Sequence, residues 1–146
     1  MLTKSLSEIY ERNLLQLKEE ISLYKNESEL WIVRGEISNS AGNLCLHLIG
    51  NLHHFIGATL GNTGYVRHRE SEFASKNIPR ETLLSEIDKT IEVVKATFSK
   101  MKEEDFEKEF PLLKHDKRVS NEEMLLHLFA HLNYHLGQIN YHRRLG

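Results

Sequence analysis

Cysteine, proline and long apolar runs are scarce in this sequence, which has one cysteine, Cys45, and two prolines in 146 residues. A single cysteine excludes an internal disulfide and is compatible with a reducing compartment, so we expect a cytoplasmic protein. The N-terminal segment alternates charged with apolar residues, and no later segment reaches the ~20 apolar residues of a membrane helix. The sequence therefore predicts neither a secretory signal nor a membrane partner.

An excess of charge of one sign is also missing. The chain has 19 basic and 21 acidic residues and a formal net charge of −2. Proteins that bind nucleic acids present a basic surface to the phosphates, and this composition offers no such field. We therefore expect no nucleic-acid partner. The length suits one domain with one core, which we assign to residues 1–146.

Apolar residues recur at helical spacing in four segments, and none of these shows the alternation of a β-strand. The predicted helices span about residues 5–24, 40–60, 79–101 and 120–144. Pro79 suits a first helical turn, and Ser120 with Glu123 forms a capping box. These features predict an all-α protein built as a four-helix bundle. The long loop before Pro79 is typical of functional or disordered segments. We interpret Arg67 and Arg69 within it as solvated, with binding of an anionic substrate at the mouth of the bundle as the alternative.

Histidine is the unusual part of the composition, because nine are present and seven of them fall in two segments. In the fourth predicted helix, His127, His131 and His135 form a stripe about 80° wide beside the apolar arc. His131 and His135 lie nearest that arc. Histidines four residues apart are neighbours on a helix, so two of them can bind one metal ion. The stripe therefore predicts two ligands of a metal site.

A third ligand has to come from another element, because one helix does not easily bring three imidazoles to the same ion. In the second predicted helix, His47, Asn51 and His54 lie along one strip beside the apolar arc, and His53 borders that arc on its other side. Spacing alone leaves all three of these histidines eligible. Buried imidazoles without partners are costly, so the facing clusters favour a metal site over unrelated surface histidines.

The fourth segment contains a short motif that resembles a known family. HLNYHLGQ, residues 131–138, resembles the HxxxHxGQ signature of the DinB/YfiT-like superfamily. Residues 41–60 are similar to the second helix of that family, and His47 matches its single metal histidine. Residues 67–73 are similar to a loop in one branch of the superfamily. The resemblance covers essentially the whole chain in element order.

This resemblance implies an up-down-down-up four-helix bundle, usually dimeric, that binds a nickel, zinc or similar divalent ion through three histidines. Carried over to matching positions, the ligands are His47, His131 and His135. The sequence departs from the family pattern by its extra histidines nearby. A shifted register that uses His54 or His127 therefore stays open.

Three neutral ligands would leave the charge of the ion in place and one coordination position free, which is typical of catalytic zinc sites. Such an ion can activate water, polarise a carbonyl or hold a thiolate. Asn51, Tyr134 and Gln138 are candidates for orienting the imidazoles, although Gln138 is equally suited to helix packing. His54 and His127 are further candidates for orienting the ligand imidazoles.

The resemblance implies a metal-dependent enzyme that transfers or isomerises with a low-molecular-weight thiol or hydrolyses with metal-bound water. An electrophilic ion on three neutral ligands favours the thiol transferase, acting on a small-molecule substrate. The histidine stripes contain no aspartate or glutamate, which disfavours hydrolysis by activated water. Two alternatives stay open: a hydrolase in which His54 or His127 is the base, and a non-catalytic, stress-related metal- or ligand-binding dimer. Cys45 lies within an apolar helix and is interpreted as a packing residue, not a nucleophile.

We also expect a homodimer, mainly from the resemblance. Apolar positions on the first and third predicted helices occupy broad arcs, and such breadth can serve a core and a partner together.

Overall fold

The structure is a computed structural model that describes residues 2–146. Its long helices are α1 (Leu2–Leu23), α2 (Ala41–Leu52), α4 (Arg80–Lys100) and α5 (Asn121–Leu145). Its shorter elements are α3 (Arg69–Ala74), the π-helix η2 (His53–Ala58), and the 3₁₀ helices η1 (Glu27–Trp31) and η3 (Glu103–Glu107). The residues that are described form two isolated β-bridges but no strand, so the all-α prediction is confirmed.

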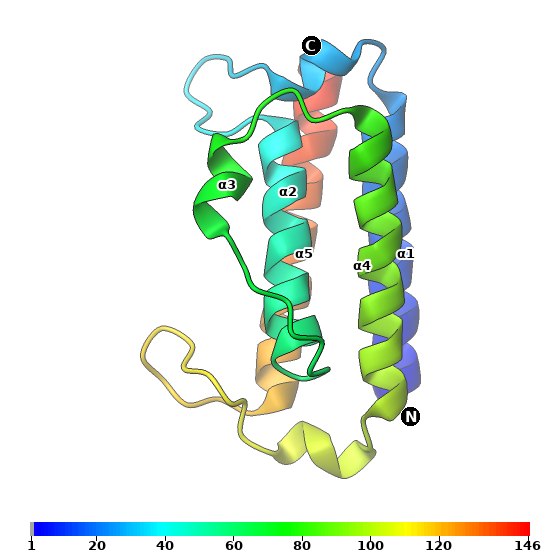
Figure 1. The fold of residues 1–146 in the computed structure, drawn as a ribbon, viewed down its shortest axis with the longest axis vertical. Helices are drawn as coiled ribbons and strands as arrows, with labels where there is room; N and C mark the ends of the chain where they lie inside the picture. The colour runs from blue at the N-terminus through cyan, green and yellow to red at the C-terminus, as the bar shows by residue number, and fades with distance from the viewer. Residues whose placement is uncertain (1) are drawn as a thin grey trace.

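The long helices lie side by side, and α3 covers the outer side of α2 (Figure 1). In that view α1 runs upward from the N-terminus, α2 and α4 run downward, and α5 runs upward to the C-terminus. α1 packs mainly on α4, while α2 contacts both α3 and α5. No helix within residues 2–146 is long and apolar enough to cross a membrane.

The core is built from the apolar stripes of all four long helices. Its most deeply buried side chains include Tyr10, Leu17, Leu48, Phe98 and Leu132. Burial of an aliphatic or aromatic side chain of this size contributes about 1.5–3 kcal/mol, so this core holds the helices in place. Cys45 is fully buried in the same core, as expected for a packing residue. Burial raises the pKa of its thiol to about 12, which disfavours a nucleophilic role.

Local signals determine where the helices begin. The Ser120 hydroxyl accepts a hydrogen bond from the Glu123 amide at 3.0 Å at the start of α5. The Ser40 hydroxyl caps α2 in the same way by accepting from the Asn43 amide at 3.2 Å. Pro79 takes the cap position of α4 instead of the first helical turn that was predicted for it.

Two features of the second predicted helix and the loop after it differ from the prediction. The helix continues beyond Leu52 as the π-helix η2, in which the Thr59 amide donates to the His54 carbonyl, five residues earlier, at 3.1 Å. A π turn is wider than an α turn, so a face calculated at 100° per residue does not continue through η2. The loop before Pro79 contains α3, which packs on α2 beside the histidines.

Candidate metal centre

Three histidines from two helices converge between α2 and α5. One nitrogen each of His47, His131 and His135 lies within 4.8 Å of the others, and no other such group is found in residues 2–146. The Nε2 atoms of His47 and His131 are 3.1 Å apart. Two imidazoles bound at 2.0–2.1 Å to one tetrahedral or octahedral ion have nitrogens about 2.9–3.4 Å apart. The spacing of this pair therefore fits a shared ion.

The surroundings keep two of these imidazoles neutral. The pKa of His131 is lowered to about 4, because burial disfavours its charged form and the neighbouring His135 and His47 add repulsion. Burial also lowers the pKa of His47, although the carboxylate of Glu72 opposes that effect. A metal ion binds the lone pair of a neutral imidazole, so both residues are in the binding form at neutral pH.

Glu72 of α3 contacts His47 on the side away from the other histidines. Its Oε1 atom lies 3.0 Å from His47 Nδ1, and both side chains are buried. Arg67 donates to both Glu72 oxygens, from Nε at 2.8 Å and from Nη2 at 2.9 Å. This carboxylate was missed because it belongs to a segment predicted as a loop. Arg67 is also not solvated as predicted, since its side chain is only 11% exposed.

His135 has a different partner from His47. Its Nδ1 atom lies 2.7 Å from Oε1 of Gln138, one turn later on α5. An amide oxygen only accepts, so this contact places the imidazole proton on Nδ1 and leaves the Nε2 lone pair free. His131 has no comparable support, because its buried Nδ1 has no hydrogen-bond partner. A carboxylate therefore orients His47, an amide orients His135, and packing alone orients His131.

The other candidates for orienting the imidazoles do not form such contacts. Tyr134 is exposed and lies with its ring centroid 5.3 Å from that of His135, in an edge-on arrangement. Asn51 is buried on α2, and its Oδ1 has no hydrogen-bond partner. Gln138 is thus the predicted candidate that the structure places in hydrogen-bonding contact with a site histidine.

The extra histidines lie outside the three-histidine group. His53 hydrogen-bonds to α4 instead. His54 lies seven residues beyond His47, about 10 Å along a helix, and its ring contacts Phe55. The ring of His127 has His115 as a neighbour, with centroids 6.1 Å apart. Neither His54 nor His127 therefore belongs to the three-histidine group, although His127 is close enough to His131 to help lower its pKa.

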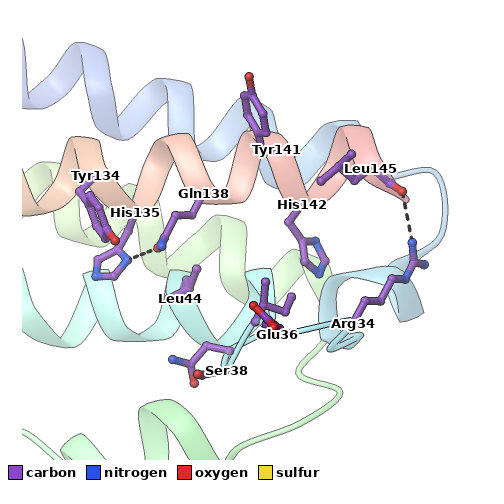
Figure 2. Close-up of a pocket in the computed structure, with 12 residues that line it drawn as sticks. Arg34, Glu36, Ser38, Leu44, Tyr134, His135, Gln138, Tyr141, His142 and Leu145 are labelled. Carbon is purple, nitrogen blue, oxygen red and sulfur yellow. Dashed lines mark hydrogen bonds between the residues drawn. The ribbon is translucent and has the colours of Figure 1, made fainter.

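A cavity of about 610 Å³ opens beside His135, between the C-terminal half of α5 and the segment before α2 (Figure 2). This volume is in the range of small-molecule sites. Its wall includes apolar parts of Ile37, Leu44, Tyr134 and Leu145. It also includes Gln138 and two side chains of opposite charge, Arg34 and Glu36. A small ligand there would lie next to the imidazole of His135.

Comparison with known proteins identifies a family but no function. Residues 3–145 match the family described as "Protein of unknown function (DUF1572)". DUF1572 is in the DinB-like superfamily, in agreement with the resemblance of residues 131–138. No curated protein matches the chain.

Proposed function

The chain belongs to the DUF1572 family, and from that membership and the three-histidine geometry we propose a DinB-like, up-down-down-up bundle that binds one divalent metal ion. The ligands are His47, His131 and His135. The observation that carries this proposal is the convergence of their ring nitrogens within 4.8 Å. Oxygen partners at Nδ1 of His47 and His135 leave their Nε2 lone pairs available for the ion.

Elemental analysis of protein purified without chelator or affinity-tag metal tests this proposal. We expect about one ion per chain, as nickel or zinc, because imidazole suits both metals. The double variant His131→Ala plus His135→Ala should lose the ion. His127→Ala is the matched control, since it removes an imidazole of the same stripe outside the group, and it should retain the ion. Unchanged metal content in the double variant would defeat the assignment.

For the activity, we propose thiol-dependent transfer to a small electrophilic substrate. A divalent ion held by these three neutral ligands would supply an electrophilic centre able to stabilise the thiolate of a low-molecular-weight thiol. The cavity beside His135 provides room for the substrate. Glu72 does not serve as a free base, because its oxygens are engaged by Arg67 and His47. This arrangement supports transfer over activation of water.

Hydrolysis is the second candidate, and one observation favours it. Glu36 lines the cavity and is exposed, so a carboxylate with access to solvent faces the space where a substrate would lie. Glu36 is therefore a further candidate base beside His54 and His127. Metal-replete protein should be compared on small thiols with electrophiles and on activated esters and amides. Ester turnover that needs no thiol and disappears in Glu36→Gln would make hydrolysis the better assignment.

Inactivity on both substrate panels would favour the third candidate, a metal- or ligand-binding homodimer without catalysis. We propose a homodimer with or without catalysis, on the resemblance to the DinB/YfiT-like superfamily. Among the described residues, α5 carries four of the exposed large apolar side chains and α4 carries none. The third predicted helix, α4, therefore offers no exposed large apolar side chain to a partner. A monomeric mass by light scattering at micromolar concentration would rule the dimer out.

A further inference from the structure

The short helix α3 is held on α2 by buried hydrogen bonds. Asn43 of α2 is fully buried, and its Nδ2 donates to the Glu72 carbonyl at 2.9 Å and to the Ser75 carbonyl at 2.8 Å. Lys76 donates to Oδ1 of the same asparagine at 2.6 Å. These bonds position the backbone of the last turn of α3. They therefore fix the position of the Glu72 backbone, from which its side chain extends toward His47.

Glu72 also requires a glycine on the facing helix. A Cβ atom added at Gly50 would stand 2.6 Å from the carboxyl carbon of Glu72 and would come still closer to Oε2. Real Cβ atoms essentially never approach another atom so closely, and the carboxylate would have to move. Gly50, one turn after His47 on α2, thus leaves the space in which Glu72 reaches that histidine.

The contacts of His47 Nδ1 favour one tautomer of its ring. The Glu72 Oε1 atom is 3.0 Å away and accepts hydrogen bonds, while Arg67 Nη2 is 3.4 Å away and donates them. With the proton on Nδ1, the ring donates to the carboxylate. With the proton on Nε2, the Nδ1 lone pair would face the carboxylate oxygen. The geometry therefore favours the tautomer whose Nε2 lone pair faces His131.

We propose that Glu72 is a positioning residue of the metal centre. Paired with Arg67 and placed against Gly50, it holds His47 in the Nδ1–H tautomer and so presents Nε2 to the ion. The part of this inference that concerns metal affinity rests on the proposed function. The tautomer of His47 is a property of the full chain without metal, so the two ideas can fail separately.

The tautomer is measured on metal-free protein labelled with ¹⁵N-histidine, by long-range ¹H–¹⁵N spectra at pH 8. His47→Gln identifies the His47 signals. We expect the Nδ1–H pattern in the parent protein and a shift toward the Nε2–H pattern in Glu72→Ala. The exposed Glu70 lies on the same helix, and Glu70→Ala should change nothing. An Nε2–H pattern in the parent protein, or an unchanged pattern in Glu72→Ala, would overturn the inference.

Metal affinity provides the second readout, measured with Zn²⁺ against a chelating dye. Removal of a group that orients a metal ligand typically weakens binding 10–100-fold, and we expect a loss in this range for Glu72→Ala. Glu72→Gln keeps the shape and an accepting oxygen, so its loss should be smaller. Unchanged affinity in both variants would overturn the inference. Failure of the parent protein to bind Zn²⁺, with a tautomer that still depends on Glu72, would defeat the proposed function alone.

Discussion

The two helices that supply the candidate ligands support their histidines by different means. On the α2 side, a buried carboxylate paired with an arginine contacts His47. On the α5 side, the exposed amide of Gln138 contacts His135 at the edge of a cavity. Hydrogen bonds to charged groups are roughly twice as strong as neutral ones, and burial excludes competing water. In the proposed site, α2 would therefore provide the more fixed half, and α5 the half that lies beside the cavity.

The largest effect is expected from breaking the ion pair on the α2 side. Arg67→Met would leave the buried Glu72 carboxylate without its cation, at a cost of about 3–5 kcal/mol in unfolding free energy. Urea unfolding measures this change. Adding Glu72→Met to the same chain removes the unpaired charge and should restore part of the loss. An Arg67→Met protein as stable as the parent would show that the pair does not stabilise this side.

A smaller loss, about 10–100-fold in Zn²⁺ affinity, is expected for Gly50→Ala, because the new Cβ displaces Glu72. Alanine has a higher helix propensity than glycine by about 1 kcal/mol, so a weakened α2 would not explain the loss. Gly137→Ala on α5 is the matched control, since a Cβ there meets nothing within 4 Å. Equal affinities of the two variants would contradict the steric role of Gly50.

A still smaller effect is expected at Gln138. Gln138→Ala should weaken Zn²⁺ binding only a few-fold, because a net hydrogen bond contributes about 0.5–1.5 kcal/mol and water can replace an exposed amide. Gln138→Glu would give His135 a carboxylate partner and should strengthen binding above that of the parent. Competition with a chelating dye measures the Zn²⁺ affinity of Gln138→Ala, of Gln138→Glu and of the parent protein. A loss in Gln138→Ala as large as that in Glu72→Ala would remove the distinction between the two sides.

The smallest effect concerns the ion pair between α1 and α5, formed by Glu20 and Arg143 at 2.8 Å. Burial raises the pKa of Glu20, but hydrogen bonds from Arg143 and Asn140 outweigh burial and lower it overall. The resulting stability is present above the unfolded-state pKa of about 4.3 and is lost as the pH falls through the lower folded-state value. Glu20→Gln should therefore flatten the acid limb of a thermal-unfolding profile recorded against pH. An unchanged acid limb would refute this role.

The sequence predicted the α5 half of the site better than the α2 half, and the reason is geometric. His131 and His135 lie within one regular α-helix, where four-residue spacing determines their relative position. Glu72 lies 25 positions from His47 and meets it only through the packing of α3, which periodicity does not describe. The assignment of His47 came from family resemblance, since spacing alone left His53 and His54 equally eligible.

The fold was predicted at the level of its four long helices, whose apolar stripes are regular. The π-helix after Leu52 was not predicted, because the apolar pattern continues through it while the hydrogen-bonding changes. The cavity was not predicted either. It depends on the segment that contains Arg34 and Glu36, which has no periodic pattern and is placed by tertiary contacts.

The unpartnered Nδ1 of His131 would affect the exchange of a metal ion at the proposed centre. Its ring can turn about the Cβ–Cγ bond without breaking a hydrogen bond at that nitrogen, whereas turning His47 or His135 breaks one. His131 is therefore the ligand expected to detach first. In the proposed centre, the carboxylate behind His47 would add to the affinity for the ion, and the unpartnered Nδ1 of His131 would affect how quickly the ion enters and leaves.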